Sequence, residues 1–153
     1  KESIIAIFFR GYDQERVILW QTAIKMFQSK PLFGVGLNNY QLYFPSLNPG
    51  VHLSAFTHAH NSFLNILAEM GLVGLLLISG WLFLIFDKAF KIFKQHHDSF
   101  LVSLAIAFIG CLISILIHGL FDLSLFMDRN TYLLMLILGL MTSLTTKATR
   151  ESS

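Results

Sequence analysis

The chain has 153 residues, of which 54% are hydrophobic and only 13% charged, with a net charge of +2. A soluble domain carries about 25% charged residues, so this composition excludes a disordered chain or a coiled coil, and the small net charge argues against a nucleic-acid partner. The lone Cys111 excludes an internal disulfide. We therefore expect an all-α integral membrane protein and, because it begins at Lys1 rather than Met, a piece of a longer chain.

Residues 1–61 are predicted to lie outside the membrane and to contain an amphipathic helix at about 13–29. Arg16 and Trp20 share one face of this helix, and Pro31 is expected to end it. In one interpretation the face rests at the membrane interface, with the arginine snorkelling and the tryptophan as an anchor. In the other, the arginine binds an anion.

Two glycines follow the helix, Gly34 and Gly36, within the segment 31–40. They permit a tight turn and close approach of backbone to a ligand. As a phosphate loop the segment is incomplete, because the Walker lysine and the dinucleotide spacing are missing. Residues 41–56 contain prolines and a glycine, and we expect an irregular loop there.

A polar cluster stands directly before the first long apolar run. It comprises His58, His60 and Asn61, with Asn61 or Ser62 as the predicted N-cap. Histidine exchanges a proton near neutral pH, and a helix N-terminus favours anions. The cluster therefore suits acid–base work on an anionic substrate. The alternatives are a histidine pair without a role and a metal site. We predict no metal, because Glu69 is the only other nearby ligand.

Three apolar runs are long enough to be candidate membrane spans. Lysines and arginines stay on the cytoplasmic side, which places the polar cluster on the extracytoplasmic side. The resulting order is a span at 62–86, a cytoplasmic loop at 87–99, a span at 100–121, an outer loop at 122–130, a span at 131–146 and a cytoplasmic tail at 147–153.

Two further polar groups lie within or beside these spans. Glu69 forms a stripe with Ser62 and Asn65, and an ionisable group at membrane depth usually faces a bundle interior or a wet cavity. A structural contact and a functional role are both open for it. His118 and Asp122 form a second pair, expected to cap a helix end or to meet the first cluster.

In this order and spacing, the motifs resemble those of the O-antigen ligase and O-antigen polymerase family of bacterial membrane glycosyltransferases. They are Arg16 with Trp20 and Ala23, the segment Pro31–Gly36, His60-Asn61-x-x-Leu64, Glu69-x-Gly71-x-x-Gly74 and the second-span ending His118–Asp122. The resemblance implies the C-terminal part of a larger GT-C-like bundle, which needs the missing N-terminal transmembrane helices of its parent chain.

The resemblance also implies a reaction on the outer face of the bacterial inner membrane. A glycan would move from an undecaprenyl-diphosphate carrier to a lipid A core, polysaccharide or protein hydroxyl, without metal or cofactor. By the same resemblance His60 is the base and Arg16 neutralises the diphosphate. Substrate contacts are expected from His58, Asn61, Trp20, Glu69, Gly34 and Gly36.

A second interpretation comes from a different class of protein. The chain would be a non-catalytic membrane subunit or a transporter fragment, with a polar pathway through Glu69 and His118. Loss of Glu69 would then stop function while loss of His60 would be tolerated. If every polar group merely anchors the interface, Arg16→Lys should be silent, whereas a bidentate phosphate contact would not tolerate it.

Overall fold

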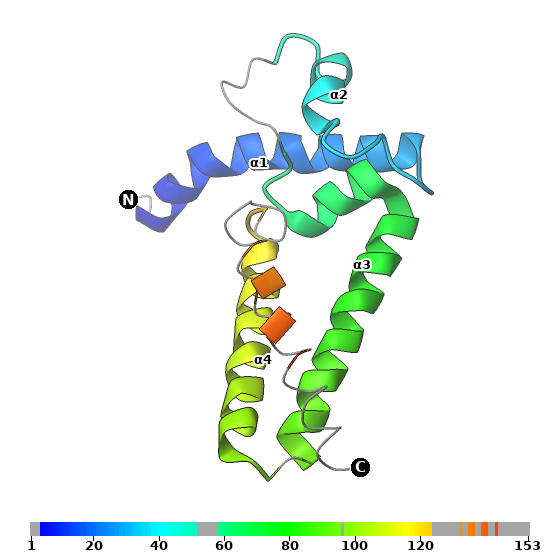
Figure 1. Ribbon diagram of the computed structural model, residues 1–153. Helices are drawn as coiled ribbons and strands as arrows, with labels where there is room; N and C mark the ends of the chain where they lie inside the picture. The colour runs from blue at the N-terminus through cyan, green and yellow to red at the C-terminus, as the bar shows by residue number, and fades with distance from the viewer. Residues whose placement is uncertain are drawn as a thin grey trace. The chain divides into compact units, whose positions relative to one another are not determined.

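A computed structural model describes residues 4–51, 58–95 and 97–123, together with isolated helical positions between 132 and 143. Over these residues the fold is helical without strands, and its four helices are α1 (Ile4–Ser29), α2 (Tyr40–Leu47), α3 (Ser62–Gln95) and α4 (Ser99–Gly119) (Figure 1). The chain divides into two compact units. The first is Lys1–Leu77 with Gly119–Leu123, and the second is Ile78–His118 with Ser124–Ser153.

Helix α1 ends at Ser29, just before Pro31, as the sequence predicts. Its start is a correction, because the helix begins at Ile4 and not at about residue 13. The residues before position 13 are mostly apolar and contain no proline, so the helix continues through them.

The first unit is organised around one buried core. Three of its residues, Leu19, Ala23 and Met26, follow one another at helical spacing along α1. Arg16 and Trp20, which share the predicted face, are half-buried and do not belong to this core. The remaining core residues come from the segment after α1, from α2 and from the start of α3: Val35, Tyr40, Phe44, Ala59 and Ala68.

Helix α2 was not expected, because prolines and a glycine favoured an irregular loop at 41–56. Two contacts of Tyr40 explain it. Its backbone N–H donates to Glu69 Oε1 at 2.9 Å, and its hydroxyl donates to Leu19 O at 2.6 Å. A carboxylate at the first turn satisfies an N–H that has no partner within the helix and suits the helix dipole. Tertiary contacts thus stabilise a short helix that contains Pro45.

Helix α3 is broken at Gly71, which adopts the left-handed φ of 67° (Figure 1). The segment after α1 pairs with the backbone on both sides of the break. Val35 N–H donates to Ala68 O at 2.9 Å, and Leu72 N–H donates to Pro31 O at 2.9 Å. The groups that a broken helix leaves without partners are therefore satisfied by another part of the chain.

Gly34 and Gly71 are required by this pairing. A Cβ at Gly34 would collide with the backbone of Glu69, and a Cβ at Gly71 would collide with the backbone of Leu32. Both residues also have positive φ, where side chains are strained. These two glycines therefore allow two backbone segments of one unit to touch.

In the second unit, the part of α3 from Ile78 onward and α4 form an antiparallel pair (Figure 1). Their shared core consists of Leu82, Ala89, Ala105, Phe108 and Leu112. Helices α3 and α4 are both long and apolar enough to cross a membrane. This agrees with the first two predicted spans. The predicted third span at 131–146 lies largely outside the described residues, and the outer loop and the tail lie almost wholly outside them.

Residues 87–99, predicted as a cytoplasmic loop, are mostly helical in the structure. Helix α3 continues to Gln95, and Asp87 pairs with Lys91 one turn later at 2.6 Å. Such i, i+4 pairs stabilise helices. Helix α4 begins after Asp98, whose Oδ1 accepts the Phe100 N–H at 2.8 Å as an N-cap.

Candidate functional site

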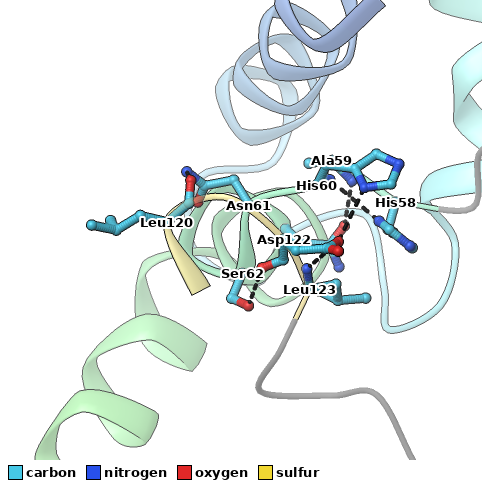
Figure 2. Close-up of polar contacts among 9 residues, drawn as sticks. His58, Ala59, His60, Asn61, Ser62, Leu120, Asp122 and Leu123 are labelled. Atoms are coloured by element: carbon cyan, nitrogen blue, oxygen red, sulfur yellow. Dashed lines mark hydrogen bonds and ion pairs between the residues drawn. The ribbon is translucent and has the colours of Figure 1, made fainter. Parts of the chain in front are cut away.

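The polar cluster before α3 meets Asp122, which follows α4. His60 Nδ1 lies 3.0 Å from Asp122 Oδ1, and the two side chains point toward one another (Figure 2). Their exposed fractions are 25% and 36%, so a substrate can reach the pair. Asp122 belongs to the first compact unit with His60. This confirms the expectation that one member of the pair His118 and Asp122 meets the cluster.

Further contacts fix the two segments to each other. Asn61 Nδ2 donates to Leu120 O at 2.9 Å, and Ser62 Oγ donates to Asp122 O at 3.0 Å (Figure 2). Asn61 Oδ1 accepts the N–H groups of Phe63 and Leu64, each at 3.0 Å, which confirms it as the N-cap. Two of the N–H groups that could have bound an anion at this helix start are therefore already occupied.

His58 supports the backbone of His60. The His60 N–H donates to His58 Nδ1 at 3.2 Å, and the two rings meet edge to face with their centroids 4.3 Å apart. His60 has a φ of 47°, a left-handed conformation that costs energy in a residue with a Cβ. The hydrogen bond from its N–H helps to hold this conformation, and with it the direction of the imidazole.

A chain of buried hydrogen bonds extends from this loop into the core. Ala59 N–H donates to Asn65 Oδ1 at 3.2 Å, and Asn65 Nδ2 donates to Glu69 Oε2 at 3.1 Å. The other Glu69 oxygen accepts the Tyr40 N–H. Both oxygens of this carboxylate thus hold the fold together. Of the two roles left open for Glu69, the geometry favours the structural contact.

The surroundings of Asp122 and His58 shift the pKa of each side chain. Burial alone would raise the pKa of Asp122, but the Leu123 N–H bond and the hydrogen bond and charge of His60 outweigh it, so this pKa lies below its usual range. Burial, followed by the charge of His60, lowers the pKa of His58. Asp122 is therefore ionised and His58 neutral near pH 7.

An ionised Asp122 fixes the tautomer of His60. The Nδ1–H donates to the carboxylate, so in the neutral ring the lone pair is on Nε2. A histidine oriented in this way can act as a general base, because the neighbouring carboxylate would stabilise the imidazolium.

His58, His60 and Asp122 also lie close enough together to hold a metal ion. One ligand atom from each lies within 4.8 Å of the others. The third ligand comes from far along the chain, whereas the sequence pointed to Glu69. Three protein ligands with an open position are what a catalytic zinc site has. Metal binding is therefore a measurable alternative to the prediction that no metal binds here.

The remaining predicted site residues lie elsewhere in the first unit. Trp20 Nε1 is buried without a hydrogen-bond partner among the described residues. Gly34 is buried against the α3 break, and the Gly36 N–H donates to Glu69 O at 2.9 Å. Arg16 is half-buried one turn before the core residue Leu19. Roles in substrate binding for these positions stay predictions.

Asp122 is the partner that the sequence did not assign to His60. The two residues are 62 positions apart, and two long apolar runs lie between them. The available signal was its position just beyond a predicted span, at the same membrane face as the histidines. This signal supports proximity and does not identify a partner.

Comparison with known families supports the resemblance inferred above. The family model described as O-antigen ligase matches residues 5–79, which include Arg16, His58 and His60. The matched range closely follows the first part of the first compact unit, Lys1–Leu77. No curated protein matches the chain. Residues 5–79 are therefore similar to an O-antigen ligase-related domain.

Proposed function

We propose that this chain takes part in moving a glycan from an undecaprenyl-diphosphate carrier to an acceptor hydroxyl in bacterial cell-surface polysaccharide biosynthesis. The contact between His60 and Asp122 is the observation that carries this proposal. The acceptor is a lipid, a polysaccharide or a protein. The O-antigen ligase match supports the reaction type, and the two apolar helices support a location in the membrane.

In the proposed reaction, the acceptor O–H gives its proton to His60 Nε2. The acceptor oxygen then forms a bond to the anomeric carbon while the bond from that carbon to the diphosphate breaks. The carrier diphosphate leaves with the electron pair, and the anomeric configuration is inverted. Asp122 stabilises the imidazolium and holds it in place.

Arg16 is the proposed partner of the departing diphosphate, because a guanidinium matches phosphate oxygens in a bidentate manner. Two observations support this role. Leu19, one turn after Arg16, belongs to the same buried core as Ala59, which directly precedes His60. Arg16 also lies within the matched range. Replacement by lysine should therefore weaken turnover even though the charge is kept.

The proposal is tested in the full-length parent chain, in a strain that lacks its own copy, at matched protein level. His60→Ala should abolish the surface glycan and cause carrier-linked glycan to accumulate. His97→Ala is the matched control, because His97 is an exposed histidine in the second unit. Unchanged surface glycan with His60→Ala would refute the catalytic role.

Treatment with a chelator distinguishes a metal-dependent reaction from the proposed metal-free mechanism. Under the proposed mechanism, purified protein treated with EDTA and dialysed should keep its transfer rate, and added Zn²⁺ or Mn²⁺ should not raise it. Loss of activity with EDTA, restored by one of these ions, would show that His58, His60 and Asp122 act as metal ligands.

A further inference from the structure

A short apolar turn follows α1 and points its side chains away from the core. Leu32 is 58% exposed and Phe33 is 72% exposed. Neither is free to fold back, because the backbone is held on both sides. Val73 N–H donates to Leu32 O at 3.1 Å, and Gly34 N–H donates to Lys30 O at 2.8 Å. The fold therefore displays two large apolar side chains on a rigid turn.

This turn is continuous with the apolar surface of α3. Its hydrogen bonds join it to Leu72 and Val73, the first residues after the break at Gly71. One turn further along α3, Leu76 and Leu77 are 63% and 69% exposed. The turn thus extends the apolar surface of a helix that is long and apolar enough to cross a membrane.

The sequence of α3 changes from polar to uncharged at Gly71, the position where the turn contacts it. Before the break, the α3 segment carries the buried polar residues Asn65 and Glu69. After it, the uncharged run Leu72–Phe86 is only about 22 Å long at about 1.5 Å per residue. A bilayer core is about 30 Å thick, so this run alone is too short to cross it, and the turn supplies apolar surface beside its outer end.

A basic and aromatic pair stands at the edge of the turn. Lys30 Nζ lies 3.2 Å from the Tyr43 hydroxyl and 5.5 Å from the centre of its ring. Both residue types have an apolar body and a polar tip, and both are favoured at membrane–water interfaces. Charge at the rim of an exposed apolar turn suits lipid headgroups.

We propose that the turn formed by Leu32 and Phe33 inserts into the outer leaflet of the bilayer, beside Leu72 and Val73. The occupant of this apolar surface is lipid. The membrane then begins at the α3 break rather than at Ser62. The α3 segment before Gly71, with its buried polar residues, lies on the water side. This inference does not depend on glycan transfer and would hold if the reaction were different.

The test is the depth of a spin label in the full chain reconstituted into phosphatidylcholine–phosphatidylglycerol vesicles. Cys111→Ser removes the native thiol, and labels are attached at Phe33→Cys and, separately, Leu32→Cys. Leu77→Cys is the lipid-facing reference, and Gln41→Cys on α2 is the exposed polar reference. Collision with molecular oxygen reports lipid, and collision with a water-soluble nickel chelate reports water.

Labels at 32 and 33 should match the reference at 77, with high oxygen and low nickel accessibility. Nickel accessibility equal to that at 41 would overturn the proposal. Low accessibility to both reagents with an immobilised label would also overturn it, because another protein segment would then cover the turn. Thermal unfolding of each labelled protein confirms that the substitutions leave the fold intact.

Discussion

The two units of this chain are stabilised by different kinds of side-chain contact. In the first unit, polar side chains make specific contacts across long stretches of sequence. Tyr40 with Glu69 and His60 with Asp122 are examples. In the helix pair of the second unit, the core is apolar, and the contacts of Ser103 and Asp87 stay within one helical turn.

The difference teaches where substitutions should matter. A hydrogen bond between distant buried groups leaves a partner unsatisfied when one member is removed. A local contact on a helix surface is worth only a few tenths of a kcal/mol. Function and fold specificity are therefore expected to be sensitive in the first unit, whereas the helix pair should tolerate any substitution that keeps its surface apolar. For Asp122 and Gly71 in the first unit, a matched residue of the second unit provides the comparison.

The largest effect is expected from Asp122→Asn. The amide carries no charge to stabilise the imidazolium of His60, so turnover should fall by about 10²- to 10⁴-fold, the usual contribution of general base catalysis. KM should change little. The control is Asp98→Asn in the second unit, where asparagine serves equally well as an N-cap. Equal activity of the two variants in an initial-rate assay would contradict the role of Asp122.

The next largest effect is expected from a comparison of Gly71 with Gly80, two glycines of α3. Gly71→Ala should destabilise the protein by about 1–2 kcal/mol from the left-handed backbone alone, and a collision with the backbone of Leu32 adds to this. Gly80→Ala meets open space within α3 and should stabilise by about 0.5–1 kcal/mol. Thermal unfolding in lipid nanodiscs measures both. A neutral Gly71→Ala would show that the break is not needed.

Glu69→Gln tests the buried hydrogen-bond chain. The new amide would present N–H groups to Asn65 Nδ2 or to the Tyr40 N–H, both of which are donors. The Asn65 side chain cannot simply turn over, because its Oδ1 accepts the Ala59 N–H. A loss of about 1–3 kcal/mol is expected, with turnover per folded molecule kept. Normal stability with abolished activity would instead favour the polar-pathway interpretation.

The smallest effect concerns His58. Its lowered pKa means that the unfolded chain, with an ordinary histidine pKa of about 6.5, binds the proton more tightly. Stability should therefore fall as the pH drops below about 6.5. His58→Asn keeps an acceptor for the His60 N–H and removes the titrating group. Between pH 7 and 5.5, the fall in melting temperature of this variant should be smaller than that of the unsubstituted protein by roughly 1–3 °C. Identical profiles would contradict this assignment.

Much of the architecture could be predicted because it follows from local patterns. Apolar runs gave the two described spans, Pro31 gave the end of α1, and Asn61 before an apolar helix gave the N-cap. The family resemblance rested on motif order and agrees with the match to residues 5–79.

What could not be predicted depends on contacts between distant residues. Helix α2 is stabilised by Glu69, 29 positions away from Tyr40, and no local pattern indicates this. The break at Gly71 forms because the segment after α1 supplies the missing hydrogen bonds. Asp122 lies beyond an intervening pair of helices, so only the tertiary fold identifies it as the partner of His60.

The most direct test of the central claim is a double-mutant cycle on glycan transfer with His60→Ala, Asp122→Asn and the two combined. Residues that act as one unit are non-additive. The account predicts that Asp122→Asn causes a large loss alone and no further loss when His60 is already alanine. If the two losses instead multiply, Asp122 acts independently of His60, and the proposed dyad is wrong.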